Sequence, residues 1–173
     1  ESWGAHPAHV DFGLLYHTRL PMLRRAFARF LQSPPADFDE YVASQSAWLP
    51  EYALFMAVKA LFGNGPWTDW PADIRAHQPS ALMRYRAELA EDVQFHCFLQ
   101  YCFHTQWQRL RRYANANGIR IIGDLPIYVP LDSADVWANP ENFQLTRTRR
   151  PRVVAGCPPD GFSKSGQYWG TPI

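Results

Sequence analysis

Hydrophobic residues recur at helical spacing through the first two thirds of the chain. Leu23, Phe27 and Phe30 are three or four positions apart, which places them on one face of a helix. Thr18 is suited to cap a helix N-terminus, because its hydroxyl accepts a hydrogen bond from a free backbone N–H. The pattern therefore predicts a helix over residues 20–31.

Two further helices are predicted before the middle of the chain. One covers residues 38–47. The next begins at Pro50, because proline fits the first turn of a helix, and its apolar face contains Leu54, Val58 and Leu61. Two glycines shortly beyond Leu61 indicate where this helix ends.

A long helical pattern occupies residues 79–116, and a tryptophan-rich connection at residues 66–71 precedes it. We expect the tryptophan rings to pack on the core, with a surface for a ligand as the alternative. An unbroken helix of this length would span roughly 57 Å at about 1.5 Å per residue, so we predict a break near residues 89–92. Beyond the break, apolar residues form a stripe on one face of the helix, namely Phe95, Leu99, Cys102, Leu110 and Tyr113.

An apolar segment at residues 119–122 follows directly after an Asn-Gly pair that ends the long helix. We interpret it as a buried strand. The predicted fold class is α/β, with a mainly helical region at residues 1–118 and a strand with its loops at residues 119–173. A second strand is predicted over residues 150–154, in a hairpin.

Composition limits the classes of function. Seventeen basic and 16 acidic residues give a formal charge of +1, so a nucleic-acid partner is not expected. No apolar run approaches the roughly 18 residues of a membrane span, so no membrane partner is expected either. Three cysteines without a C-x-x-C pair predict reduced thiols and a cytoplasmic location. Because the sequence begins without Met, we expect it to be an excerpt of a longer protein.

Several kinds of site are not predicted. The chain lacks the glycine-rich phosphate and dinucleotide motifs, and His96 and His104 have no carboxylate at a metal-ligand offset. We therefore expect no cofactor and no metal. The arginine-rich run at residues 147–152 could contact phosphate, but the low net charge favours a solvated hairpin tip.

Asp124 follows the predicted strand at residues 119–122 after a single glycine, Gly123. Parallel α/β folds, barrels above all, place binding and catalytic groups at the carboxyl ends of strands. A turn cap or a pairing with an arginine is the structural alternative. Asp132 and Asp135 are predicted instead to cap a short helix or turn at residues 133–138.

Aromatic residues alternate with polar ones from residue 123 onward. Flat rings cover the C–H face of a sugar, and carboxylates and amides bind its hydroxyls. Rings at this density also occur in protein cores, so both interpretations stay open for Tyr128, Trp137, Phe143, Phe162, Tyr168 and Trp169.

Two long stretches, residues 118–145 and 153–172, resemble signature regions of the 4-α-glucanotransferases, the amylomaltase family of glycoside hydrolases (family 77). Earlier stretches resemble the preceding parts of the same family. The resemblance implies part of a (β/α)₈ TIM barrel with large, mainly helical insertions. It also implies transfer of α-1,4-glucan segments between maltodextrin chains by a retaining double displacement.

The resemblance also implies which residues form the functional site. The family's nucleophile lies in an Arg-x-Asp-His stretch that this sequence lacks. We therefore expect no catalytic residue in this chain and no activity from it alone. Substrate-binding roles are implied for Asp124, Tyr128, Asp160, Phe162, Gln167 and Trp169.

Gly161 replaces a tyrosine that is common in the family, which is expected to weaken contact with a long glucan. The alternative function is a non-catalytic helical module that binds carbohydrate or another partner.

Overall fold

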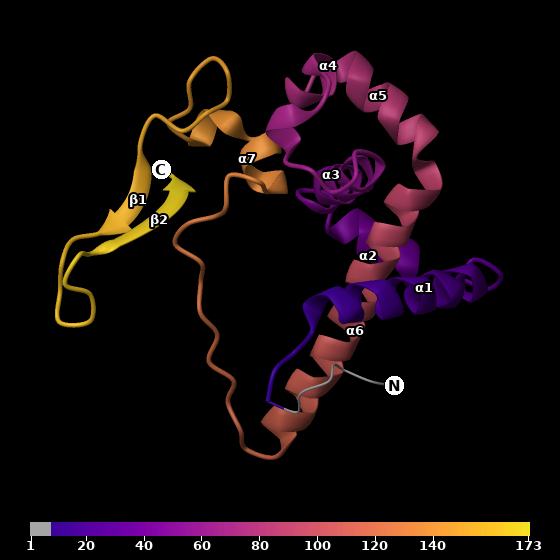
Figure 1. The fold of residues 1–173 in the computed structure, drawn as a ribbon. Coiled ribbons are helices and arrows are strands. Elements are labelled where there is room, and N and C mark those ends of the chain that lie inside the picture. The colour runs from indigo at the N-terminus through magenta and orange to yellow at the C-terminus, as the bar shows by residue number, and fades with distance from the viewer. Residues whose placement is uncertain (1–7) are drawn as a thin grey trace.

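A computed structural model describes residues 8–173 and shows a helical body from which a two-stranded hairpin extends (Figure 1). The elements of the described chain are α1 (Phe12–Phe30), α2 (Phe38–Ser44), α3 (Leu49–Leu61), the 3₁₀ turn η1 (Trp67–Asp69), α4 (Ala72–Arg75), α5 (Pro79–Glu88), α6 (Ala90–Ala116), α7 (Ala134–Ala138), the 3₁₀ turn η2 (Pro140–Asn142), β1 (Val154–Cys157) and β2 (Gln167–Pro172). The chain is thus helix-rich.

Helix α3 lies at the centre of the helical body and contacts α5, α6 and α7. Its residues Leu54, Phe55 and Val58 are buried in a cluster that also contains Trp67 and Trp70 of the tryptophan-rich connection. The expectation that these rings pack on the core is confirmed. Leu61 is half exposed, so its assignment to the buried face of α3 was wrong.

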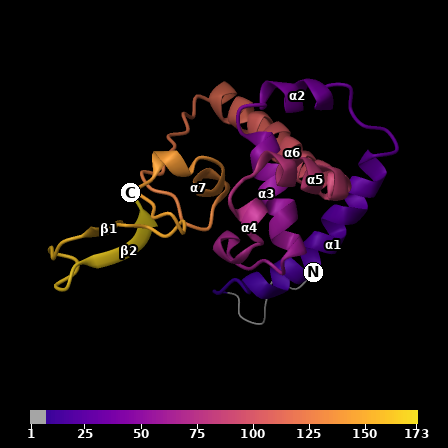
Figure 2. The same ribbon diagram turned by 90° about the horizontal axis from the view of Figure 1, so that it is seen from above.

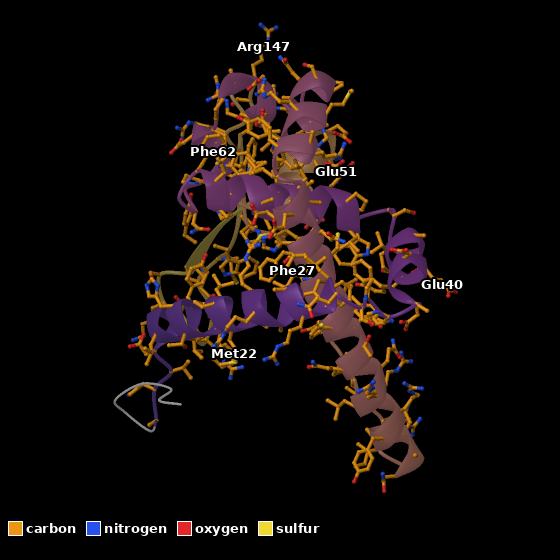
Figure 3. The ribbon with its side chains drawn as sticks, turned by 90° about the vertical axis from the view of Figure 1, so that its right-hand side faces the viewer. Met22, Phe27, Glu40, Glu51, Phe62 and Arg147 are labelled. Atoms are coloured by element: carbon orange, nitrogen blue, oxygen red, sulfur yellow. The ribbon has the colours of Figure 1, made fainter. Side chains whose placement is uncertain are left out.

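Helix α1 crosses α6 and contributes Phe27 to a cluster of phenylalanine rings (Figure 3). The ring centroid of Phe27 lies 5.5 Å from that of Phe95 and 5.4 Å from that of Phe98. Offset and edge-to-face ring pairs at this separation stabilise a core beyond the area they bury. The crossing therefore joins the first helix to the longest one.

The start of α1 differs from the sequence prediction. The helix begins eight residues earlier, where the Asp11 side chain accepts a hydrogen bond from the backbone N–H of Leu14 at 2.8 Å. The Thr18 hydroxyl donates to the carbonyl of Leu14 instead of capping. Pro21 lies inside the helix, so a proline after a possible cap did not mark its first turn.

The break in the long helical segment is confirmed, because Leu89 separates α5 from α6. The apolar stripe of α6 is only partly buried. Phe95, Leu99 and Cys102 pack in the body, whereas Leu110 and Tyr113 are 53% and 71% exposed. The C-terminal half of α6 runs beyond the crossing with α1 (Figure 3), so the later stripe residues have no helix of the described chain over them.

Residues 119–122 do not form the predicted strand. They are irregular and exposed, with Ile122 94% exposed. A strand needs a neighbour for its backbone N–H and C=O groups, and no strand of the described chain lies beside this segment. No barrel is visible in residues 8–173.

The strands that do form are β1 and β2, which pair antiparallel with Gly156 opposite Tyr168 and Cys157 opposite Gln167. The second predicted strand is therefore shifted, since β1 begins only at Val154. The predicted arginine-rich hairpin tip is confirmed. Leu145 pairs with Pro151 across it.

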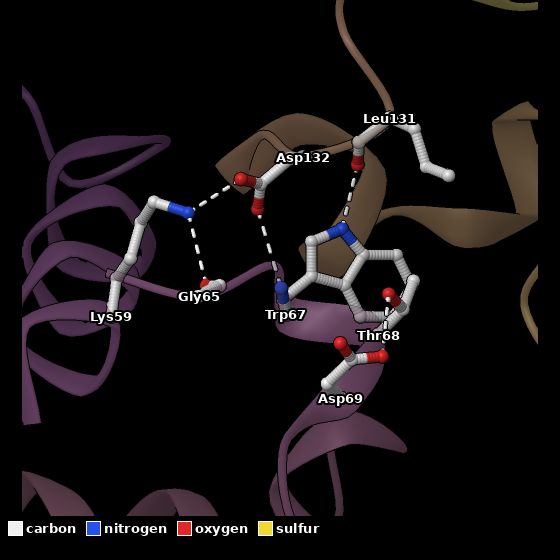
Figure 4. Close-up of polar contacts among 7 residues, drawn as sticks. All are labelled: Lys59, Gly65, Trp67, Thr68, Asp69, Leu131 and Asp132. Atoms are coloured by element: carbon white, nitrogen blue, oxygen red, sulfur yellow. Dashed lines mark hydrogen bonds and ion pairs between the residues drawn. The ribbon is translucent and has the colours of Figure 1, made fainter. Parts of the chain in front are cut away.

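Asp132 does not cap a helix. Its carboxylate pairs with Lys59 of α3 and accepts from the backbone N–H of Trp67 at 3.3 Å (Figure 4). The Trp67 indole N–H donates to the carbonyl of Leu131. Ser133 is the residue that caps α7. Asp132 thus links the segment before α7 to the helical body.

No helix of residues 8–173 is both long and apolar enough to cross a membrane.

Glu51 connects α3 to the region of α4 and α5. Its carboxylate lies 2.8 Å from Nε2 of His77 and pairs with the guanidinium of Arg86. The hydrogen bond from His77 is the largest cause that holds the pKa of Glu51 below its usual range, against an opposing effect of burial.

We expect Glu51→Gln to flatten the dependence of the melting temperature on pH. A carboxyl whose pKa is lowered in the folded state stabilises the protein at pH values above its ordinary pKa of 4.5. This contribution is lost as the pH falls through the lower pKa of the folded state. Thermal unfolding between pH 6 and pH 3 measures the effect. Glu40→Gln on α2 is the matched control, because Glu40 is exposed and points outward (Figure 3). Equal pH dependence in the wild type and both variants would contradict the role of Glu51.

Candidate functional site

The loop that joins β1 to β2 covers residues 158–166 and lies at the end of the hairpin away from the helical body (Figure 1). Oδ1 of Asp160 accepts hydrogen bonds from the backbone N–H groups of Phe162 at 2.8 Å and Ser163 at 2.7 Å. The N–H groups of Ser163 and Phe162 hold the pKa of the Asp160 carboxyl below its usual range. The Ser163 hydroxyl donates to the carbonyl of Gly166 at 2.6 Å. Side-chain hydrogen bonds therefore set the shape of the loop.

Two glycines permit the close approach of β1 and β2 on either side of the loop. Gly166 has a φ of +74°, and a Cβ there would lie 2.5 Å from the carbonyl oxygen of Cys157. A Cβ on Gly156 would lie 2.7 Å from the carbonyl oxygen of Gln167. Any side chain at either position would force backbone atoms to move.

Three of the predicted site residues come together beside β2. The ring centroids of Tyr128 and Trp169 are 5.9 Å apart, although the residues are distant in sequence. Oε1 of Gln167 accepts a hydrogen bond from the indole N–H of Trp169 at 3.0 Å. Trp169 is 47% exposed, so the pair presents an accessible ring surface next to an amide.

Phe162, the one aromatic residue of the 158–166 loop, is 99% exposed. Asp160 positions it through the N–H bond described above. A phenylalanine with nearly its whole surface in water gains nothing from the hydrophobic effect in this conformation. Its position is therefore suited to contact with a ligand or with another part of the protein.

Asp124 lies apart from this group. It is exposed, and its Oδ1 accepts only the backbone N–H of the next residue, Leu125, at 2.9 Å. Within the described chain it has no arginine or lysine within ion-pair distance. The structural alternative of a pairing with an arginine is thus not seen, and the side chain is free to serve another contact.

Of the remaining aromatic candidates, Trp137 is buried in the core and Tyr168 is 81% exposed on β2.

Ser163 shapes the loop but was not among the predicted site residues. The signal was present in the sequence, because Asp160 and Ser163 are three positions apart in a glycine-rich segment, a spacing typical of side-chain-capped turns.

The described residues contain no cluster of His, Cys, Asp and Glu that could hold a metal ion.

A comparison with known protein families places this geometry in context. The profile of the 4-α-glucanotransferase family matches residues 2–173. The chain belongs to the 4-α-glucanotransferase family.

Relatives in this family include the 4-α-glucanotransferase of Thermus thermophilus, which is 46% identical over 177 residues covering 100% of this chain and 35% of the relative. The 4-α-glucanotransferase of Streptococcus pneumoniae (strain TIGR4) is 44% identical over 173 residues, covering 99% of this chain and 34% of the relative. The chain thus spans about a third of the length of these 4-α-glucanotransferases.

A solved structure has a similar fold. The amylomaltase from Streptococcus agalactiae in complex with acarbose superposes with a TM-score of 0.92 at 41% identity, covering 100% of this chain and 35% of that one. The predicted resemblance to the 4-α-glucanotransferase family is therefore confirmed over the whole chain.

We expect Asp160→Ala to loosen the 158–166 loop without unfolding the protein. The amides of Phe162 and Ser163 should exchange with solvent about fivefold faster or more, because they lose a charged acceptor. Hydrogen exchange resolved to single residues measures this. Asp160→Asn is the control, since its side-chain oxygen still accepts a hydrogen bond. Unchanged exchange at both amides in Asp160→Ala would contradict the capping role.

Proposed function

We propose that the protein containing this chain transfers α-1,4-glucan segments between maltodextrin chains, by a retaining double displacement. Membership of the 4-α-glucanotransferase family over residues 2–173 is the observation that carries the activity. Retention requires one carboxylate as nucleophile and a second carboxyl group as acid and base. Because the chain has no Arg-x-Asp-His stretch, we expect this pair elsewhere in the protein and no transfer by residues 1–173 alone.

The role proposed for this chain is to bind the glucan. Tyr128 and Trp169 offer ring faces to the apolar side of glucose units, and Gln167 offers an amide for hydroxyl groups. Phe162 at the tip of the loop would close over the bound chain. Exclusion of water by this closure favours attack by a sugar hydroxyl over attack by water.

A barrel is also proposed for the whole protein. Ile119, Ile121 and Ile122 are apolar and exposed here, which is costly unless other strands cover them. In this arrangement residues 119–122 would pair with neighbouring strands, and Asp124 at their carboxyl end would face the cleft and orient the sugar or the catalytic groups.

A cytoplasmic location is proposed from the cysteines. Cys97, Cys102 and Cys157 are all free thiols, which suits a reducing compartment.

Asp124→Asn in the whole protein should lower kcat/KM for maltodextrin transfer at least about 100-fold, or roughly 2.7 kcal/mol of transition-state stabilisation. The melting temperature should stay near that of the wild type, because Asp124 is exposed and its one hydrogen bond is local. Asp39→Asn on α2 is the matched control. If Asp124→Asn melted early while its folded fraction kept full activity, the role of Asp124 would be structural.

The loop and the ring pair are tested with maltotriose and with a long maltodextrin as donor and acceptor. Trp169→Ala should raise KM, since loss of one ring contact costs on the order of 1 kcal/mol. Phe162→Ala should raise the share of hydrolysis relative to transfer, and Gly161→Tyr should tighten binding of long chains.

Tyr168→Ala is the matched control, because Tyr168 neighbours Trp169 on β2 but lies on the other side of the strand. Free glucose and longer maltodextrins are quantified together with melting temperatures. A hydrolysis-to-transfer ratio that does not move in Phe162→Ala would refute the closing loop.

A further inference from the structure

An arginine-lined cavity of ≈ 730 Å³ lies between the hairpin tip, residues 146–150, and the segment containing η1 and α4. We call it the tip pocket. It is lined by one acidic residue, Asp69, and by four arginines, Arg75, Arg147, Arg149 and Arg150. Arg147 reaches the outer end of the molecule and points outward (Figure 3), so the pocket is accessible from solvent. Basic charge is therefore concentrated at one place in a chain of formal charge +1.

Of the four arginines of the tip pocket, Arg75 donates to the carbonyl of Thr68 at 3.1 Å. Arg24, Arg84 and Arg86 each pair with a carboxylate. Within residues 8–173, no carboxylate lies within ion-pair distance of the four arginines of the tip pocket. Four cations near one another repel unless an anion lies among them.

Hydrogen bonds close the backbone turn that carries three of these arginines, Arg147, Arg149 and Arg150. The N–H of Thr146 donates to the carbonyl of Arg150 at 2.7 Å, and the Thr146 hydroxyl accepts from the N–H of Arg150 at 3.1 Å. Arg149 has a φ of 62°, a left-handed conformation that glycine adopts without strain and arginine does not. An arginine at this position is unfavourable for the turn itself, and strained residues of this kind cluster at ligand contacts.

Guanidinium groups bind phosphate through two parallel N–H···O bonds, and clusters of arginine are typical of phosphate recognition. The same pocket has neutral hydrogen-bonding side chains on Thr68, Gln78 and Thr148, which suit hydroxyl groups. We propose that the tip pocket binds a phosphorylated sugar, with the phosphate among the arginines and the hydroxyls on the neutral side chains. This site is separate from the 158–166 loop and does not depend on glucan transfer.

The test measures binding of glucose 6-phosphate, inorganic phosphate and glucose to the whole protein by isothermal titration calorimetry at constant ionic strength. The tip variant is Arg147→Ser with Arg149→Gly, in which glycine suits the left-handed turn and the fold is kept. The control variant is Arg25→Ser with Arg29→Ser, two exposed arginines of α1 that carry the same charge. Melting temperatures are recorded for all samples.

Glucose 6-phosphate should bind the wild type and the control variant equally, within about twofold, and bind the tip variant at least about tenfold more weakly. Glucose should not bind there. The proposal is overturned if glucose 6-phosphate does not bind, if both variants weaken it equally, or if inorganic phosphate binds as tightly as the sugar phosphate. The proposal is also overturned if a single-stranded oligonucleotide binds more tightly than glucose 6-phosphate and the tip variant abolishes this binding. The ligand of the tip pocket would then be a nucleic acid.

Discussion

The burial of Trp137 is the interaction on which the C-terminal third of the chain depends. Its ring is 1% exposed and lies against Phe55, Trp70 and His77, and its indole N–H donates to the carbonyl of Ile74 at 2.9 Å. Helix α7 has only five residues, too few to be stable alone in water. It is held because one large side chain enters a core made by α3, η1 and α4. The ion pair of Lys59 with Asp132 fixes the entry to the same helix.

This attachment decides where the hairpin can be. Helix α7 lies between the hairpin and the helical body in both views of the ribbon (Figures 1 and 2). Beyond η2, the N–H of Gln144 donates to the carbonyl of Ile173, which ties the start of the hairpin to its last residue. Within the described chain, residues 119–127 have no comparable contact, and their isoleucine and leucine side chains are exposed. The place of the hairpin relative to the helical body is therefore fixed by the burial of Trp137 and not by residues 119–127.

The sequence predicted features that depend on neighbouring residues, and it failed where a distant partner decides the outcome. The break at Leu89 and the end of α6 follow from local propensity, and both are observed. The strand at residues 119–122 depends on other strands, which no local pattern can supply. Asp132 looked like a helix cap because a short helix follows it, yet its partners Lys59 and Trp67 are more than 60 positions away. For the site, family resemblance named the residues, but only the fold brought Tyr128 onto Trp169.

The hairpin carries the two sites proposed above, one at each end. At one end, the arginine tip lies against η1 and α4 and is bounded by the helical body. At the other end, Phe162 projects from a loop whose own hydrogen bonds hold it. The tip pocket is lined by two parts of the chain, which suits the small, charged ligand that we propose for it. The 158–166 loop lies away from the helical body (Figure 1), which suits the closure over a long, neutral glucan that we propose. Within the described chain, only the arginine end of the hairpin lies beside the core that Trp137 completes, so we expect the tip pocket to be the more rigid of the two proposed sites.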